Sequence, residues 1–198
     1  AFYVWITIVL CVLIMHYISK VNPLVKLRKY EYLIVINLAA SFAMLGTFIY
    51  GGYFWASIVA STTALLASFV FCYFFVVDAR KIQDTSKIWF LAGLFFAVIS
   101  SIGVFNLAYM MSSKNINQDL YLASEYYFLH FQYNGFFIFS CIGLLLYSMK
   151  EAGSPISAKK NKLLFWLMFF GCLIGVGLSF LWMKLPAMIF AVIVLGTL

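Results

Sequence analysis

Residues 55–77 read WASIVASTTALLASFVFCYFFVV, and no Asp, Glu, Lys or Arg interrupts these 23 residues. A transmembrane helix needs about 20 mostly apolar residues. Because the hydrocarbon core offers no water to bond peptide groups, an unbroken apolar run of this length is expected to be an α-helix, whereas β-barrel strands would give short alternating segments. This segment therefore predicts a helix that crosses a membrane.

The same pattern recurs along the whole chain. Hydrophobic residues make up 66% and charged residues 10% of the 198 residues, whereas soluble domains are about 45–50% apolar and about 25% charged. We exclude a soluble globule and predict an all-α, polytopic transmembrane helix bundle of about seven spans, forming a single domain over 1–198. The last span is incomplete, and we expect the chain to be an excerpt of a longer membrane protein. The spans are expected at 1–19, 33–53, 55–77, 88–111, 126–148, 163–183 and 187–198.

The basic residues alternate between the connections of these spans. The connections 20–32, 78–87 and 149–162 hold four, three and four Lys or Arg residues, eleven of the thirteen in the chain. The positive-inside rule assigns these connections to the cytoplasm, so we predict a multi-pass protein of a cell inner (plasma) membrane with its N-terminus outside. Topology also accounts for the net charge of +7. The expected partners are the lipid bilayer and other membrane subunits or further copies of the chain, and no nucleic acid is expected.

Polar residues gather at the start of the fifth span, where residues 125–135 read EYYFLHFQYNG. His130 and Asn134 are four residues apart and share one helix face, and ionisable groups at membrane depth usually face the bundle interior or a cavity. We take His130, Gln132 and Asn134 as candidates for a ligand site or polar cavity, with a water, a hydroxyl or a neighbouring carbonyl as partner of the imidazole. The alternative interpretation is an interfacial belt of Tyr and His that anchors the helix.

Small residues form a stripe on the sixth span at Gly171, Gly175 and Ser179. Small residues let helices approach closely, so this stripe predicts a helix-packing face. Neutral polar residues elsewhere in the spans are expected to bond between helices or to carbonyls four residues back. These residues are Asn37, Ser41, Ser57, Ser61, Thr62, Thr63 and Asn106.

The sequence predicts no metal site and no catalytic residue. The four cysteines lie inside apolar runs without a CxxC pair. The second histidine of the chain, His16, ends the first span, roughly 20 Å from His130 in depth at a helix rise of about 1.5 Å per residue. The two histidines are therefore not expected to hold one metal together, and whether the chain is an enzyme stays open.

The segment YYFLHFQYNGFF at 126–137 resembles the sixth helix of the central subunit of the haem-copper oxidase superfamily, particularly its nitric oxide reductase branch. Aromatic residues come first, then His130, then Gly135 five positions later, in a span that enters from outside. The segments VVDARK at 76–81 and NINQD at 115–119 fall where that branch has a basic cytoplasmic turn and a polar outer loop. The resemblance implies that the seven spans correspond to helices two to eight of a twelve-helix subunit.

The same resemblance places His130 on one of three histidines that hold the family's second metal, copper or non-haem iron. The adjacent histidine pair expected on the next helix is missing from 175–182, which reads GVGLSFLW, and Asn134 stands where the reductase branch has a glutamate. One imidazole cannot hold a catalytic metal by itself. The family's low-spin haem ligand would fall at or before residue 1, so the cofactor stays unknown, with haem possible through residues outside this segment.

We therefore expect a degenerate relative of the respiratory subunit, acting as a non-catalytic structural or electron-transfer-associated membrane subunit. One alternative is a small-solute transporter or channel-like protein with its polar site around His130. Another is a scaffold without a ligand.

Overall fold

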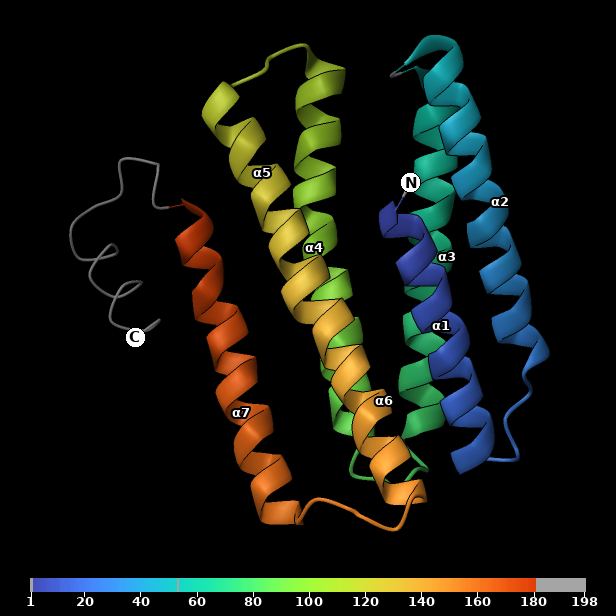
Figure 1. The fold of residues 1–198 in the computed structure, drawn as a ribbon. Coiled ribbons are helices and arrows are strands. Elements are labelled where there is room, and N and C mark those ends of the chain that lie inside the picture. The colour runs from blue at the N-terminus through green and yellow to red at the C-terminus, as the bar shows by residue number, and fades with distance from the viewer. Residues whose placement is uncertain (1, 53, 181–198) are drawn as a thin grey trace. The chain divides into compact units, whose positions relative to one another are not determined.

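A computed structural model describes residues 2–52 and 54–180 of the chain. All regular structure in this part is helical, which confirms the predicted all-α class (Figure 1). The predicted seventh span, 187–198, lies outside the described residues. The elements in chain order are α1 (Phe2–Val21), α2 (Arg28–Gly51), α3 (Trp55–Ala79), α4 (Lys87–Ser113), α5 (Gln118–His130), the π-helix η1 (Phe131–Phe137), α6 (Ile138–Glu151), α7 (Ala158–Gly175) and the 3₁₀-helix η2 (Val176–Phe180).

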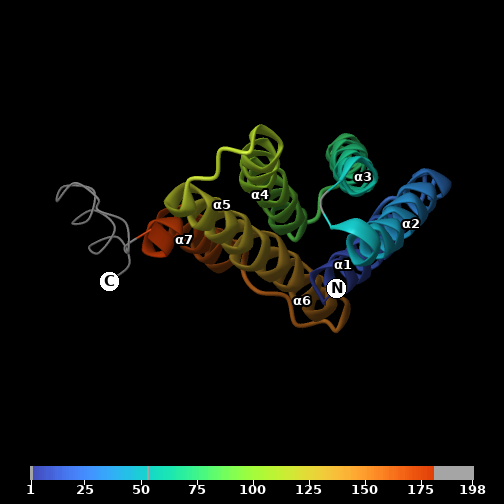
Figure 2. The same ribbon diagram turned by 90° about the horizontal axis from the view of Figure 1, so that it is seen from above.

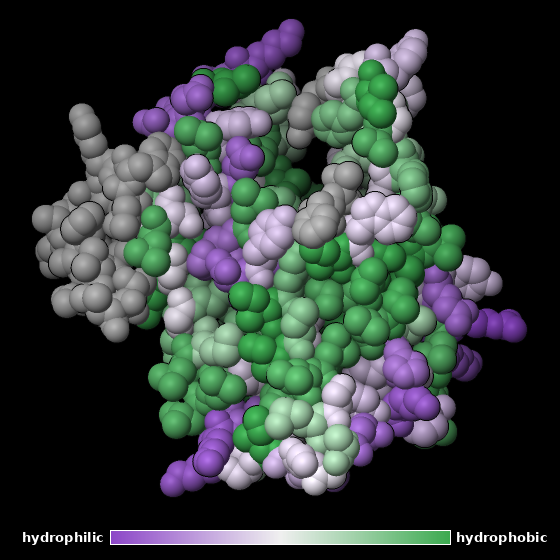
Figure 3. Space-filling model, viewed as in Figure 1, coloured by the Kyte–Doolittle hydropathy of each residue, from purple (hydrophilic) through white to green (hydrophobic). Residues whose placement is uncertain are grey.

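Most of these helices have the length and composition of membrane spans. Within the described residues, five are long and apolar enough to cross a bilayer: α2, α3, α4, the continuous helix α5–η1–α6, and α7 with η2. The apolar part of α1, Trp5–Val21, is shorter. On the face that Figure 3 shows, hydrophobic residues cover most of the helix surfaces, as expected for a multi-pass membrane protein.

Two of the helices begin well before the apolar runs that predicted them. The connection expected at 112–125 is reduced to 114–117, and α7 begins five residues before the expected span. The Asn117 Oδ1 and the Ser157 Oγ each accept a hydrogen bond from the backbone N–H three residues on, at 3.1 Å and 3.4 Å. Such N-caps start a helix in polar sequence. The apolar runs alone therefore place the starts of α5 and α7 too late in the chain.

The chain divides into two units, Ala1–Lys87 and Ile88–Leu198. In the first unit, α2 and α3 pack along each other, and α1 contacts both. A tight turn follows α2 at Gly52. Gly52 has a φ of +67°, which glycine adopts without steric cost, and its N–H donates to the carbonyl of Phe48 at 3.1 Å.

Neutral polar residues inside the first unit bond as the sequence predicted. The Asn37 amide on α2 donates to the Ser68 hydroxyl of α3 at 2.8 Å, which links the two helices. The hydroxyls of Thr62 and Thr63 instead donate to carbonyls of their own helix, four residues back. The two expected kinds of bond, between helices and within one helix, are therefore both confirmed.

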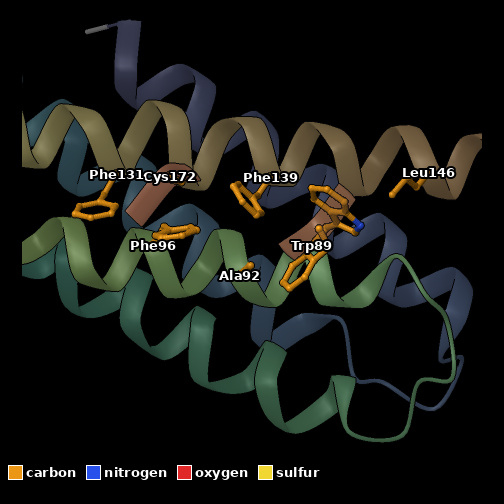
Figure 4. Packing of buried hydrophobic residues seen from close by; sticks show 8 residues of the cluster. Trp89, Ala92, Phe96, Phe131, Phe139, Leu146 and Cys172 are labelled. Atoms are coloured by element: carbon orange, nitrogen blue, oxygen red, sulfur yellow. The ribbon is translucent and has the colours of Figure 1, made fainter. Parts of the chain in front are cut away.

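In the second unit, α4, α6 and α7 pack around an aromatic core. Figure 4 shows Trp89 and Phe96 of α4 facing side chains of the continuous helix. The Phe96 ring stacks on the Phe131 ring with centroids 5.6 Å apart, and Trp89 lies 5.4 Å from Phe139. The Trp89 indole N–H also donates to the Asn161 Oδ1 of α7 at 2.8 Å, so this buried donor has a partner.

Glycines bring α4 close to the continuous helix, and Figure 2 shows the two from above. A Cβ placed on Gly135 of η1 would lie 2.4 Å from the Cβ of Phe96, and one placed on Gly103 of α4 would lie 2.4 Å from the carbonyl oxygen of Ser124. Any side chain at either position would force the helices apart. The second unit therefore depends on close contact between α4 and the α5–η1–α6 helix.

Candidate functional site

His130, the last residue of α5, connects that helix to α7. Its Nε2 lies 2.9 Å from the carbonyl oxygen of Cys172, and its Nδ1 lies 3.2 Å from the amide nitrogen of Asn134. A carbonyl can only accept a hydrogen bond, so Nε2 carries the proton, and Nδ1 accepts from the Asn134 amide. This arrangement uses both nitrogens of the imidazole. His130 and Asn134 share one side of the helix, and the carbonyl of Cys172 supplies the neighbouring carbonyl expected as a partner.

The surroundings of the imidazole come mainly from α7. A Cβ placed on Gly175 would lie 3.4 Å from the His130 Cε1, and the Cys172 thiol sulfur lies 4.0 Å from Nε2. The Phe131 ring meets the imidazole edge to face, with centroids 5.3 Å apart. Carbonyls in the last turn of a helix lack intrahelical partners, so a donor beside α7 at this point stabilises the end of that helix.

Gln132, the third candidate, points elsewhere. It is 2% exposed, and its Oε1 accepts a hydrogen bond from the Ser100 hydroxyl of α4 at 2.9 Å. A residue two positions along a helix lies on nearly the opposite side. The structure therefore brings His130 and Asn134 together and places Gln132 against α4.

These residues lie at or within η1, the seven-residue π-helix FQYNGFF. Its backbone bonds run from each residue to the fifth one along, and such segments are rare and frequent at functional sites. Ser140, three residues beyond η1, is fully buried on α6, and its hydroxyl has no hydrogen-bond partner in the described residues. Neither the π-helix nor the unpartnered hydroxyl has a signal in the sequence.

The small residues of α7 and η2 differ in their surroundings. Gly175 lies beside His130, whereas no described atom lies within 4 Å of a Cβ placed on Gly171. Ser179 lies in η2, and the packing face expected from this stripe stays a prediction. The closest approaches between helices occur at other glycines. These are Gly93 and Gly103 on α4, which are ten residues apart, and Gly135 and Gly143 on the helix that α4 contacts, which are eight residues apart. Neither pair has the four-residue spacing of the stripe.

One polar cluster that the sequence analysis missed lies in the first unit, at the end of α3. Asp78 forms an ion pair with Lys29 at 2.6 Å and accepts a hydrogen bond from the hydroxyl of Tyr30 at 2.7 Å. The Lys29 ammonium also lies 4.8 Å from the ring centroid of Phe74, within cation–π range. Tyr30 precedes the predicted span 33–53. Tyr30 is fully buried, and the Asp78 carboxylate gives its hydroxyl an acceptor.

A second carboxylate lies in the connection before α4. Asp84 is 4% exposed and accepts hydrogen bonds from the Tyr17 hydroxyl at 2.9 Å and the Ser86 N–H at 3.2 Å. It thereby joins α1 to the residues that lead into α4. Both carboxylates lie beside basic residues at the ends of apolar runs, and this position is the signal in the sequence that could have found them.

A cavity of about 500 Å³ lies between α4, α5 and η2. Asn106, Ser124 and Tyr127 are among its lining residues, and none of His130, Gln132 and Asn134 lines it. The polar site that a transporter would need around His130 is therefore separate from this cavity.

The donor atoms around His130 do not fit the metal centre that the resemblance implies. The chain has two histidines, fewer than that centre requires. Within residues 2–52 and 54–180, no group of three or more His, Cys, Asp or Glu side chains could hold a metal ion. No protein-family model, curated protein or solved structure matches this chain.

Proposed function

We propose that this chain is a non-catalytic subunit of a larger assembly in a bacterial-type inner membrane, related to the central subunit of the haem-copper oxidases. Its role is to join and support helices beside the electron-transfer partners of that assembly. The resemblance of residues 126–137 supports the proposed family. The hydrogen bonds of His130 support the proposed structural role.

The observation that carries the proposal is the pair of hydrogen bonds made by the imidazole. Nε2 donates to the Cys172 carbonyl and Nδ1 accepts from Asn134, so the one histidine at this position bonds helix to helix. A metal ligand would need one of these nitrogens as an unprotonated donor to the ion. The geometry thus supports a structural use of the position where the resembled family holds a metal.

The test is the absorption spectrum of the purified full-length protein, together with the His130→Phe and His130→Gln variants. We expect a Soret band from a haem that residues outside this segment bind. The band should be the same in both variants. His130→Phe should lower thermal stability more than His130→Gln, because the Gln amide can still donate to the Cys172 carbonyl.

Two results would overturn the proposal. The absence of a Soret band from the full-length protein would contradict the proposed relationship to the haem-copper oxidases. A band that both variants lose, while their circular dichroism stays native, would make His130 a cofactor ligand and the non-catalytic role untenable.

The topology that we propose has seven spans with the N-terminus outside, so that the connections 20–32, 78–87 and 149–162 face the cytoplasm. The support is the eleven bases that these connections hold. In intact cells, an impermeant maleimide should label Asn115→Cys and miss Ser154→Cys until the cells are lysed. The parent protein reports any labelling of the four native thiols. Labelling of Ser154→Cys in intact cells would reverse the orientation.

A further inference from the structure

The cavity between α4, α5 and η2 is an open groove whose volume and apolar lining fall within the range of small-molecule sites. Its volume of about 500 Å³ lies within the range of about 300–1,000 Å³ that ligand pockets occupy. Apolar side chains form most of the wall, and the polar residues are few, as is usual in such pockets. The lining includes Ile102, Gly103 and Asn106 of α4, Ser124 and Tyr127 of α5, and Phe180 of η2.

The cavity forms where α4 and α5 separate. Gly103 holds the two backbones together, since a Cβ there would lie 2.4 Å from the Ser124 carbonyl oxygen. From that contact the helices diverge toward the connection 114–117 (Figure 1). Both walls belong to helices that can cross a bilayer, and the lining residues Leu120, Ala123 and Ser124 come just before the predicted span 126–148. We therefore place the cavity near the membrane surface, where the polar group of an amphiphile lies.

The hydrogen bonds of Ser124 fix the orientation of the amide of Asn106 in the cavity wall. The single proton of the Ser124 hydroxyl is donated to the Leu120 carbonyl at 2.6 Å. The Ser124 oxygen therefore accepts from the Asn106 Nδ2, also at 2.6 Å. This leaves the Asn106 Oδ1 turned away from Ser124, without a protein donor in the described part of the chain.

Among the described residues, the Asn106 Oδ1 is therefore a free acceptor in the open cavity, and a molecule that displaces water there must supply a donor or leave this oxygen unsatisfied. A ligand with a hydroxyl group would supply the missing donor. No charged side chain of residues 2–52 and 54–180 lines the cavity, so a carboxylate or phosphate placed there would have no counter-charge from them. The chemistry of the wall thus selects a neutral molecule with an apolar body and one hydroxyl.

We propose that this cavity binds a neutral, hydroxyl-bearing amphiphile of the membrane, a molecule of the monohydroxy lipid type such as a diacylglycerol. The apolar body packs against Ile102, Tyr127 and Phe180, and the hydroxyl donates to the Asn106 Oδ1. This site is separate from the His130 position, and it does not depend on the function proposed above.

The experiment measures the thermal stability of the full-length protein in detergent against increasing concentrations of three probes. The probes are 1,2-dioctanoylglycerol, its 3-O-methyl ether, and dioctanoyl phosphatidic acid. We expect saturable stabilisation by the first probe and about fivefold weaker binding of the ether, since one hydrogen bond of about 1 kcal/mol is lost. Phosphatidic acid should bind more weakly than the alcohol.

Two variants locate the binding. Asn106→Leu should abolish the difference between the alcohol and the ether. Ile102→Trp should fill the cavity and abolish saturable binding of both, whereas Ile138→Trp, an exposed isoleucine of α6 outside the cavity, should bind like the parent.

Several results would overturn the proposal. Equal binding of the alcohol and the ether to the parent protein would remove the role of the hydroxyl, and this comparison needs no variant to fold. Tighter binding of phosphatidic acid would assign an anionic lipid instead. If every probe stabilises without saturation, or if Ile102→Trp binds like the parent, the stabilisation comes from nonspecific partitioning and not from binding in the cavity.

Discussion

The two units of the chain hold their helices together with different chemistry. In the first unit, α1, α2 and α3 are tied at one end by carboxylates, where Asp78 binds Lys29 and Tyr30, and Asp84 binds Tyr17. In the second unit, glycine contacts and neutral polar pairs join the helices along their length, as with Ser100 and Gln132.

The difference follows from where an ionised group can be accommodated. A charge within the hydrocarbon region is costly, so carboxylate links are confined to helix ends, whereas amide and hydroxyl links are allowed at any depth. The first unit joins charged side chains at its helix ends, and its helices expose long apolar surfaces. The second unit buries half of the spanning segments of α4 and of the continuous helix. Similar apolar composition therefore produces one unit that adds carboxylate links at its helix ends to the packing of α2 along α3, and another that relies on close glycine contacts and neutral polar pairs.

The largest effect that would test this comparison is expected from Gly135→Ala. The new Cβ would lie 2.4 Å from the Phe96 Cβ, and a Cβ cannot move away without a shift of the backbone. We expect a loss of about 3 kcal/mol in the free energy of unfolding, at the upper end of the usual cost of overpacking. The measurement is SDS-induced unfolding in mixed micelles, followed by circular dichroism.

The matched control is Gly171→Ala, because no described atom lies within 4 Å of a Cβ at that position. Replacing glycine by alanine in an open helix position should stabilise by up to about 1 kcal/mol. Equal stability of the two variants would mean that close packing is not what holds the second unit together.

A smaller effect is expected from Asp78→Ala, which removes the shared partner of Lys29 and Tyr30. The Tyr30 hydroxyl would stay buried without an acceptor, so we expect a loss of about 2 kcal/mol. The control is Asp119→Ala, an exposed acid in the first turn of α5, where the loss should stay below about 1 kcal/mol. If both variants lose the same stability in the SDS assay, the carboxylate cluster does not tie the first unit.

The smallest effect compares two buried serines of the second unit. Ser100→Ala removes the hydrogen-bond partner of the buried Gln132, which should cost about 1 kcal/mol. Ser140→Ala removes a buried hydroxyl that has no partner in the described residues, so the variant should be at least as stable as the parent. Thermal unfolding of the two variants side by side measures the difference. A destabilised Ser140→Ala would show that this hydroxyl makes a bond after all.

Much of the fold could be predicted because membrane spans are a local property of the sequence. Apolar runs located the helices, and Asn37 could be expected to bond to a neighbouring helix because amides in a membrane need partners. The starts of α5 and α7 could not be placed by the same rule, since Asn117 and Ser157 extend helices into polar sequence.

The candidate site was predicted only in part, for geometric reasons. The four-residue spacing of His130 and Asn134 placed them on one face, but the Cys172 carbonyl belongs to the backbone of another helix and has no sequence signature. Gln132 was grouped with them by proximity in sequence, although the helix turns its side chain toward α4. Close glycine contacts depend on what lies opposite each glycine, and a spacing rule within one helix does not contain that information.

The π-helix also determines where this membrane span can gain or lose a residue. Each of its turns holds one more residue than an α-turn, so the faces of α5 and α6 do not follow one uninterrupted 3.6-residue repeat. A chain shortened by one residue within 131–137 can return to ordinary α-helical bonding there, and the flanking helices then keep their directions. Helix α4 is α-helical throughout and has no additional residue to lose. The same deletion there would rotate every later side chain of that helix by about 100°. The segment is thus the point at which the length of this span can change while Gly143 still faces α4.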